Sequence, residues 1–133
     1  MIKPGFLTPA LLATFVLLAG CSAEAPDPGI PQGAGFTSWS ANGAGGEYVL
    51  NVIDGRVPAN GAATMSATVL TDANCAPDEQ GTNHCHNIIE FDNGQRIEVV
   101  NNHKMMRHRC LRPGESVNVS AMGDNWIRLQ TRS

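Results

Sequence analysis

After residue 46 the chain is built from short runs in which apolar and polar residues alternate. A period of two is typical of β-strands that bury one face. Turn signals separate the runs at Asp54-Gly55, Asp92-Asn93-Gly94, Pro113-Gly114 and Met122-Gly123-Asp124. The pattern predicts strands at residues 48–53, 64–70, 86–91, 96–100, 116–121 and 126–130. Five or six short strands predict an all-β fold, either a small barrel of the OB or SH3-like kind or a small sandwich.

One hairpin can be placed in register. A two-residue Asn93-Gly94 turn would pair Phe91 with Arg96 and mix apolar and charged residues on both faces. A three-residue loop with Gly94 in the left-handed conformation pairs Phe91 with Gln95 instead. The apolar residues that this second register gathers on one face are Phe91, Ile89, Ile97 and Val99. It gives the cleaner alternation and is the register we expect.

This hairpin also brings three histidines and a cysteine to one rim of the sheet. Its first strand begins beside His84-Cys85-His86, and its second strand ends just before His103. In an antiparallel pair, the start of one strand lies next to the end of the other. We therefore expect these residues at one rim, with Cys85 and His103 on the core side and the other two histidines on the opposite face.

The first twenty residues are predicted to be a secretory signal peptide rather than part of the fold. Met1-Ile2-Lys3 is a short positive start, residues 6–18 are mostly apolar, and Ala19-Gly20 precede Cys21. The apolar run is too short to span a bilayer as a helix.

Leu18-Ala19-Gly20-Cys21 resembles the lipobox of bacterial lipoproteins. The resemblance covers residues 1–21 and implies cleavage before Cys21, a diacylglyceryl group on its thiol and acylation of the new amino group. Several acyl chains make a stable membrane anchor. Ser22 in place of Asp implies, in that family, sorting to the outer membrane, so we expect a lipid-anchored envelope protein facing the periplasm.

Residues 22–46 are rich in Gly, Pro, Ala and Ser, which predicts a flexible tether between the lipid and a β domain at residues 47–133. Phe36 and Trp39 are exceptions, and either dock the end of the tether on the domain or sit at the membrane interface. The net charge of −3 gives no electrostatic footprint for nucleic acid. The lipid is the only membrane contact that the sequence predicts. The sequence does not predict the oligomeric state.

The loop after the hairpin, residues 104–110, adds soft ligands to the rim. Imidazole, thioether and thiolate together favour copper, Cu(I) in particular. The candidate metal ligands are His103, Met105, Met106, His108, Cys110, Cys85 and His84. The set is similar to that of the small periplasmic copper metallochaperones, which pair a histidine and two methionines beside a tryptophan. That resemblance implies such parts for His103, Met105, Met106 and Trp126.

Three cysteines remain if Cys21 is acylated, and an oxidising compartment favours a disulfide. The candidates are Cys75, Cys85 and Cys110, and the sequence does not fix which two pair. The histidines and methionines also have a purely structural explanation, as hydrogen-bonding surface groups and gap-filling core residues.

Two functions of different class follow. In the first, the His/Met/Cys rim binds copper or another soft metal for metal handling or tolerance. In the second, a disulfide-stapled module without catalytic activity binds a protein or glycan partner in the envelope. No nucleophile elbow or base-orienter pattern is present, so an enzyme is not expected.

Overall fold

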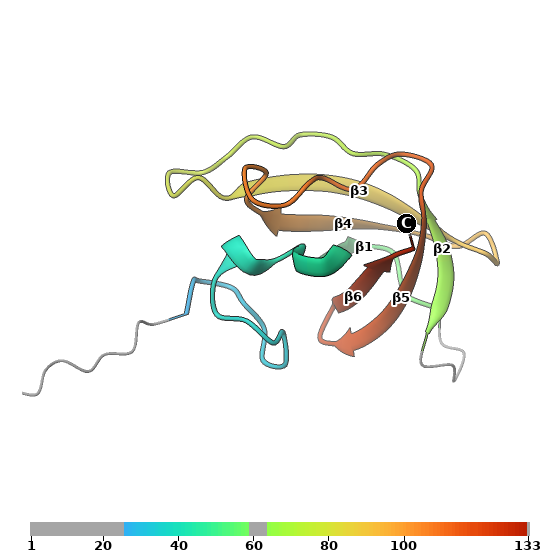
Figure 1. Ribbon diagram of the computed structural model, residues 1–133. Helices are drawn as coiled ribbons and strands as arrows, with labels where there is room; N and C mark the ends of the chain where they lie inside the picture. The colour runs from blue at the N-terminus through green and yellow to red at the C-terminus, as the bar shows by residue number, and fades with distance from the viewer. Residues whose placement is uncertain (1–25, 59–63, 133) are drawn as a thin grey trace, which may run out of the picture.

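The strands predicted from the alternating pattern all form, and they close into a barrel. The computed structural model describes residues 26–58 and 64–132. Its strands are β1 (Glu47–Asp54), β2 (Met65–Val69), β3 (Asn83–Phe91), β4 (Arg96–His103), β5 (Ser116–Gly123) and β6 (Trp126–Thr131). Their order around the closed barrel is β1-β4-β3-β2-β5-β6, as Figure 1 shows. The predicted all-β fold and small barrel are confirmed, and the sandwich alternative is wrong.

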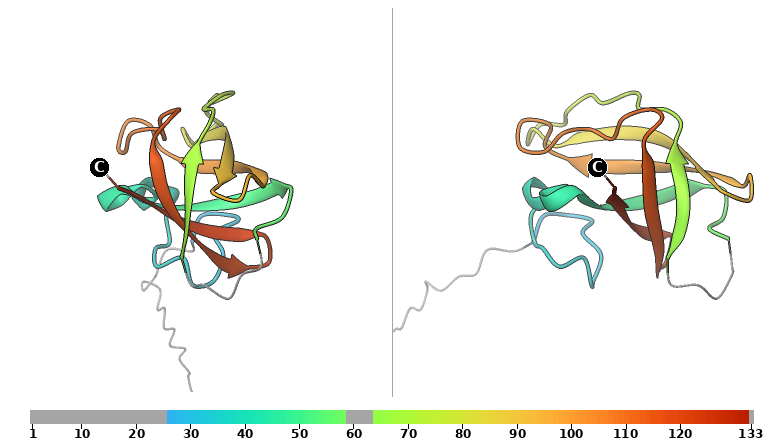
Figure 2. Two further views of the ribbon diagram at one scale, coloured as in Figure 1. Left: turned by 90° about the vertical axis from the view of Figure 1, so that its right-hand side faces the viewer. Right: turned by 45° about the vertical axis from the view of Figure 1, so that its right-hand side comes forward.

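Two hairpins and two bridging strands close the barrel. β3 and β4 form one antiparallel hairpin, and β5 and β6 form the other. β1 pairs with β4 on one side and with β6 on the other, while β2 pairs with β3 and β5. The right-hand view of Figure 2 shows β2 beside β5, where the two hairpins are joined. Since every strand has two neighbours, no described strand presents an open edge.

The β3–β4 hairpin has the register expected from the sequence. Ile89 lies opposite Ile97, and Glu90 lies opposite Arg96. Gly94 has a φ of 89°, the left-handed conformation that the three-residue loop requires. Buried and half-buried residues alternate along the whole of β3, so one face of the hairpin points into the barrel.

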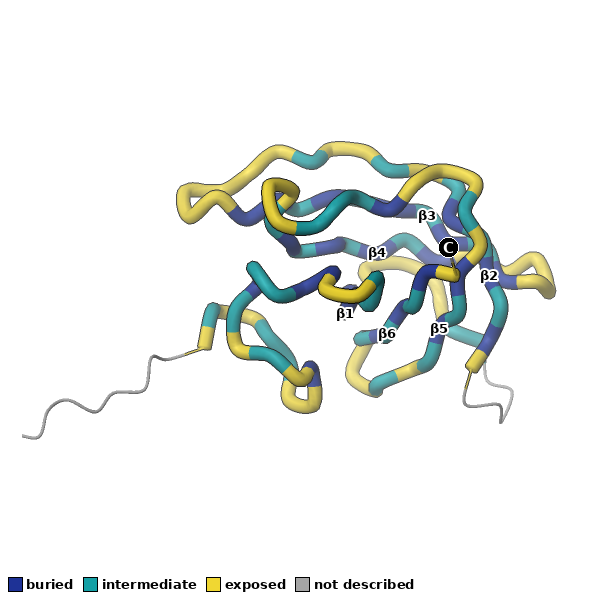
Figure 3. Tube along the Cα trace, in the orientation of Figure 1, coloured by how far each residue is buried: buried dark blue, intermediate teal, exposed yellow. Residues whose placement is uncertain are grey.

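The barrel interior is apolar for most of its length and polar at one end. Its core is formed by aliphatic and aromatic side chains from all six strands, with Leu111 added from a loop. At the end where β3 begins and β4 finishes, the interior side chains are instead Asn83, Cys85, Asn87, Asn101 and His103, all buried. Figure 3 shows the alternation of buried and half-buried residues as dark blue positions spaced along β3 and β4. The polar end is the part of the barrel interior that carries groups able to bind a ligand or to react.

The segment expected to be a flexible tether is, over residues 26–46, packed on the barrel. It contains two 3-10 turns, η1 (Trp39–Ala41) and η2 (Ala44–Gly46). Trp39 is 5% exposed and stacks on Trp126 of β6, with ring centroids 6.1 Å apart. Composition predicted disorder here, but burial of Trp39 and Asn42 orders the chain. Phe36 contacts Trp39 edge to face, so the docking alternative holds for these two aromatic residues.

The predicted signal peptide and Cys21 lie outside the described residues. Among the helices of the described ranges, none has the length and apolar character needed to cross a membrane.

Candidate metal centre

A disulfide joins Cys75 to Cys85 at the polar end of the barrel. The loop before β3 turns back along that strand, with isolated bridges from Ala73 to His86 and from Pro77 to Asn83. This return path brings the two Cα atoms to 4.0 Å. Cys85 is fully buried, as expected for the core side of β3, whereas Cys75 is half-buried. Of the pairings that the sequence left open, this is the one that forms.

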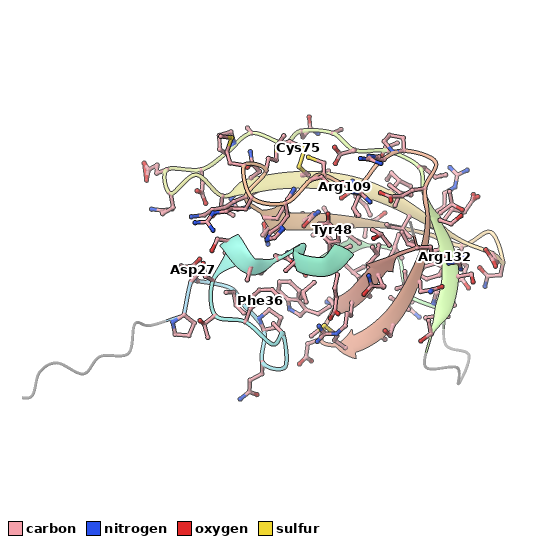
Figure 4. All side chains as sticks on the ribbon, viewed as in Figure 1. Asp27, Phe36, Tyr48, Cys75, Arg109 and Arg132 are labelled. Carbon is pink, nitrogen blue, oxygen red and sulfur yellow. A yellow bond between two sulfur atoms is a disulfide. The ribbon has the colours of Figure 1, made fainter. Side chains whose placement is uncertain are left out.

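A third sulfur approaches the disulfide from a different part of the chain. Cys110 lies in the loop between β4 and β5, is half-buried, and has a free thiol. One ligand atom from each of Asp72, Cys75, Cys85 and Cys110 lies within 4.8 Å of the others. We call these four residues the thiol cluster. Figure 4 shows the disulfide at Cys75 above β3, with the loop that carries Arg109 running beside it.

Asp72 is held in place by a hydrogen bond from the barrel interior. Its Oδ1 accepts a hydrogen bond of 2.9 Å from Asn87 Nδ2, whose amide also donates to the Thr71 carbonyl. The Asp72 carboxylate lies 3.7 Å from Cys75 Sγ. Burial raises the pKa of the Cys110 thiol, and the negative charge of Asp72 raises it further. A bound cation would reverse that effect, because a metal deprotonates the thiols that coordinate it.

Three buried polar atoms around Cys85 have no hydrogen-bond partner among the described residues. They are Asn87 Oδ1, Asn101 Nδ2 and His103 Nε2. Asn101 lies directly opposite Cys85 across the β3–β4 ladder, and Asn87 and His103 are its neighbours on the same face. Unsatisfied buried polar atoms are uncommon in folded proteins. All three belong to residues on the interior face of the β3–β4 hairpin that carries Cys85.

His103 is in the protonation state that a metal ligand needs. Burial lowers its pKa, so the imidazole is neutral at physiological pH. Its Nδ1 lies 3.4 Å from the Asn101 carbonyl oxygen, which can only accept a hydrogen bond. The ring proton is therefore assigned to Nδ1, and Nε2 keeps a free lone pair. Tyr48 packs edge to face on the ring and fixes its orientation.

The other predicted ligands lie outside the thiol cluster. His84 is on the outer face of β3, where its ring nitrogens contact Asp78 at 2.9 Å and Asn102 at 2.5 Å. Met105 and Met106 are 43% and 97% exposed. His108 is half-buried in the same loop. The structure thus brings together Cys85 and Cys110 of the predicted set, and none of the predicted histidines, His103 included, belongs to the thiol cluster.

Sequence reasoning did not include Asp72 in the site. The residue precedes Cys75 by three positions in the loop before β3, a spacing that is common by chance. Only the return of that loop along β3 places its carboxylate beside three sulfurs. The positive charge of Arg109, next to Cys110 in the chain, is offset by a bidentate ion pair with Glu115, at 2.9 and 3.1 Å.

A groove of about 610 Å3 lies on the outer side of the barrel, between the N-terminal segment and the start of β3. Its walls include Trp39, Trp126, Asp27 and Lys104, and the His84–Asp78 pair lies at one side. The hydrogen bond from His84 is the main cause that lowers the pKa of the Asp78 carboxyl. The groove is therefore a mixed aromatic and charged surface, and no residue of the thiol cluster lines it.

Comparison with family models, curated proteins and solved structures gives no match to this chain.

Proposed function

We propose that this protein is a lipid-anchored envelope protein that binds a thiophilic metal ion, Cu(I) or Zn(II), at the thiol cluster. The lipobox-like sequence ending at Cys21 supports an anchor in the outer membrane, with the barrel facing the periplasm. The observation that carries the metal proposal is the convergence of three sulfurs and one carboxylate within 4.8 Å. Thiolates favour Cu(I) and Zn(II) over harder ions.

The ligand set is complete only when the disulfide is reduced. Cys75, Cys85 and Cys110 then supply three thiolates, and the carboxylate of Asp72 supplies the fourth position of a tetrahedral Zn(II) site. Cu(I) needs only the three thiolates, so Asp72 distinguishes the two ions. The neutral imidazole of His103 and the amide of Asn101, both buried on the same face of the hairpin as Cys85, would act as supporting partners.

The test is a metal titration of the mature, lipidated protein in detergent, reduced with a phosphine and freed of metal. We expect tight binding of one ion, with the affinity reduced by at least about 100-fold in Cys110→Ala. Met106→Ala is the matched control, because this residue lies in the same loop but is almost fully exposed. Asp72→Asn should weaken Zn(II) and spare Cu(I). The absence of binding by the reduced wild-type protein would refute the proposal.

The outer groove favours a second candidate function, binding of an envelope glycan. Trp126 is half-exposed, and polar groups of Asn51 and Gln80 line the same groove. Sugars bind to such combinations of an aromatic surface with a few polar groups. Titration of the protein with soluble cell-wall oligosaccharides, followed by tryptophan fluorescence, tests this function. We expect saturable quenching that is lost in Trp126→Ala, and unchanged fluorescence would exclude it.

A further inference from the structure

We infer that Cys75, Cys85 and Cys110 form a thiol–disulfide relay, in which the Cys110 thiol exchanges with the Cys75–Cys85 disulfide and opens it to external dithiols. A disulfide that only staples a loop needs no third sulfur beside it. Here the free thiol and both disulfide sulfurs lie within 4.8 Å of one another. The activity uses residues of the proposed metal site but requires no metal.

Burial determines the order in which the sulfurs react. Cys85 is fully buried, so an external thiol cannot reach its sulfur. Cys75 and Cys110 lie on loops and are half-buried. Cys75 is therefore the sulfur that is attacked, and Cys85 is the leaving group, directed into the barrel. Exchange proceeds by attack of a thiolate on one sulfur of the disulfide.

The buried end of β4 is suited to receive that leaving group. Asn101 lies directly across the ladder from Cys85, and its Nδ2 has hydrogens but no partner among the described residues. A hydrogen bond from an amide N–H stabilises a thiolate more than a disulfide sulfur, because the thiolate carries the charge. The N–H donor of Asn101 therefore lacks a partner in the described part of the chain while the disulfide is closed, and it hydrogen-bonds to the Cys85 thiolate when the disulfide opens.

Atoms and electrons balance without an outside oxidant in the internal step. The Cys110 thiol gives its proton to the adjacent Asp72 carboxylate, and its sulfur bonds to Cys75 Sγ. The Cys75–Cys85 bond breaks, the electron pair leaves on Cys85, and Asp72 returns the proton to that sulfur. In the external step a dithiol attacks Cys75 of the Cys75–Cys110 disulfide, both of whose residues are half-buried on loops, and a second attack by the same dithiol releases it. The dithiol becomes a disulfide, and the protein gains two electrons and two protons.

The first experiment identifies the disulfides of the wild-type protein, which a chelator in the buffer keeps free of metal. The protein is quenched in acid, alkylated and digested, and the linked peptides are identified by mass spectrometry. We expect the Cys75–Cys85 link as the main species, with a smaller population of Cys75–Cys110. In Cys85→Ser, with dissolved oxygen as the oxidant, the relay predicts that Cys75 and Cys110 are oxidised to a disulfide. Circular dichroism checks that this variant folds.

The second experiment measures how fast a dithiol reductant opens the oxidised protein. We expect Cys110→Ser to react at least about ten-fold more slowly than the wild type, because it lacks the internal nucleophile. Met106→Ala should react at the wild-type rate. A single Cys75–Cys85 link in the wild type, together with equal reduction rates for Cys110→Ser, would overturn the relay. Since no metal is present, this result leaves the metal titration to decide the proposed function independently.

Discussion

Asn42 and Val49 exchange two hydrogen bonds through the side chain of Asn42. The amide oxygen accepts from the Val49 N–H at 2.7 Å, and Nδ2 donates to the Val49 carbonyl at 3.0 Å. The same Nδ2 donates to the carbonyl of Asn102 on β4 at 2.7 Å. One fully buried side chain therefore ties the N-terminal segment to both β1 and β4. It also donates a hydrogen bond of 3.4 Å to Asn101 Oδ1, at the polar end of the barrel.

We expect Asn42→Ala to lower the free energy of unfolding by about 2–3 kcal/mol, since it leaves buried backbone groups on two strands without partners. Urea unfolding followed by circular dichroism measures this. Gln32→Ala, at an exposed position of the same segment, is the control and should leave the unfolding midpoint unchanged. Equal stability of Asn42→Ala and the wild type would mean that residues 26–46 are not part of the folded unit.

Glu115 gives the fold a defined dependence on acid. Burial alone would raise the pKa of its carboxyl, but hydrogen bonds from Arg109 and from the Arg112 backbone N–H hold that pKa below its usual value. A lowered pKa in the folded state means that this stabilisation is complete above about pH 4.5, and that it is lost as the pH falls through the folded pKa.

Glu115→Gln should therefore lower the free energy of unfolding at pH 7 by about 1–3 kcal/mol, because Arg109 loses its charged partner. The difference between variant and wild type should shrink as the pH falls toward 3. Urea unfolding at several pH values measures both. A difference that stays constant from pH 7 to pH 3 would contradict the assignment of this pKa.

The Cys75–Cys85 disulfide closes a short loop, with a sequence separation of 10. Restriction of the unfolded chain by a loop of this size stabilises the folded state by about 2–3 kcal/mol. We expect that loss of unfolding free energy in the double variant Cys75→Ala/Cys85→Ala, measured without reductant. Cys110→Ala, which leaves the disulfide intact, should lose clearly less. A double variant as stable as the wild type would show that the disulfide contributes nothing to the fold.

Local patterns were sufficient to predict the hairpin that builds the site. Alternation in β3 and β4 and the Asp92-Asn93-Gly94 loop together fix which residues face each other. The placement of Cys85 and His103 on the core side follows from that register without any tertiary information. Both residues are indeed fully buried.

The rest of the site depends on long-range packing that periodicity does not encode. The partner of Cys85 is set by the return of the loop before β3, which pairs Ala73 with His86. The same return of the loop places the carboxylate of Asp72 beside the sulfur atoms of the thiol cluster. The composition of the N-terminal segment is that of a linker, and it therefore predicted a flexible tether. The contacts of Trp39 and Asn42 that order this segment are long-range, and composition does not encode them.

The methionines of the loop after β4 provide the sharpest test of how far the metal site extends. Met106 is 97% exposed and Met105 is 43% exposed, whereas Met65 is buried in the core. Oxidation to the sulfoxide follows exposure, so dilute peroxide should modify Met106 first, then Met105, and spare Met65.

The same oxidation, repeated on the reduced protein with Cu(I) bound and followed by peptide mass spectrometry, asks whether a thioether is a ligand. A metal held by the thiol cluster alone leaves the oxidation rate of Met106 unchanged, because its sulfur stays in solvent. Protection of Met106 by bound Cu(I) would instead mean that the loop folds inward to coordinate the ion. The ligand set would then include the thioether that the sequence originally suggested, and Met106→Ala would no longer serve as a neutral control.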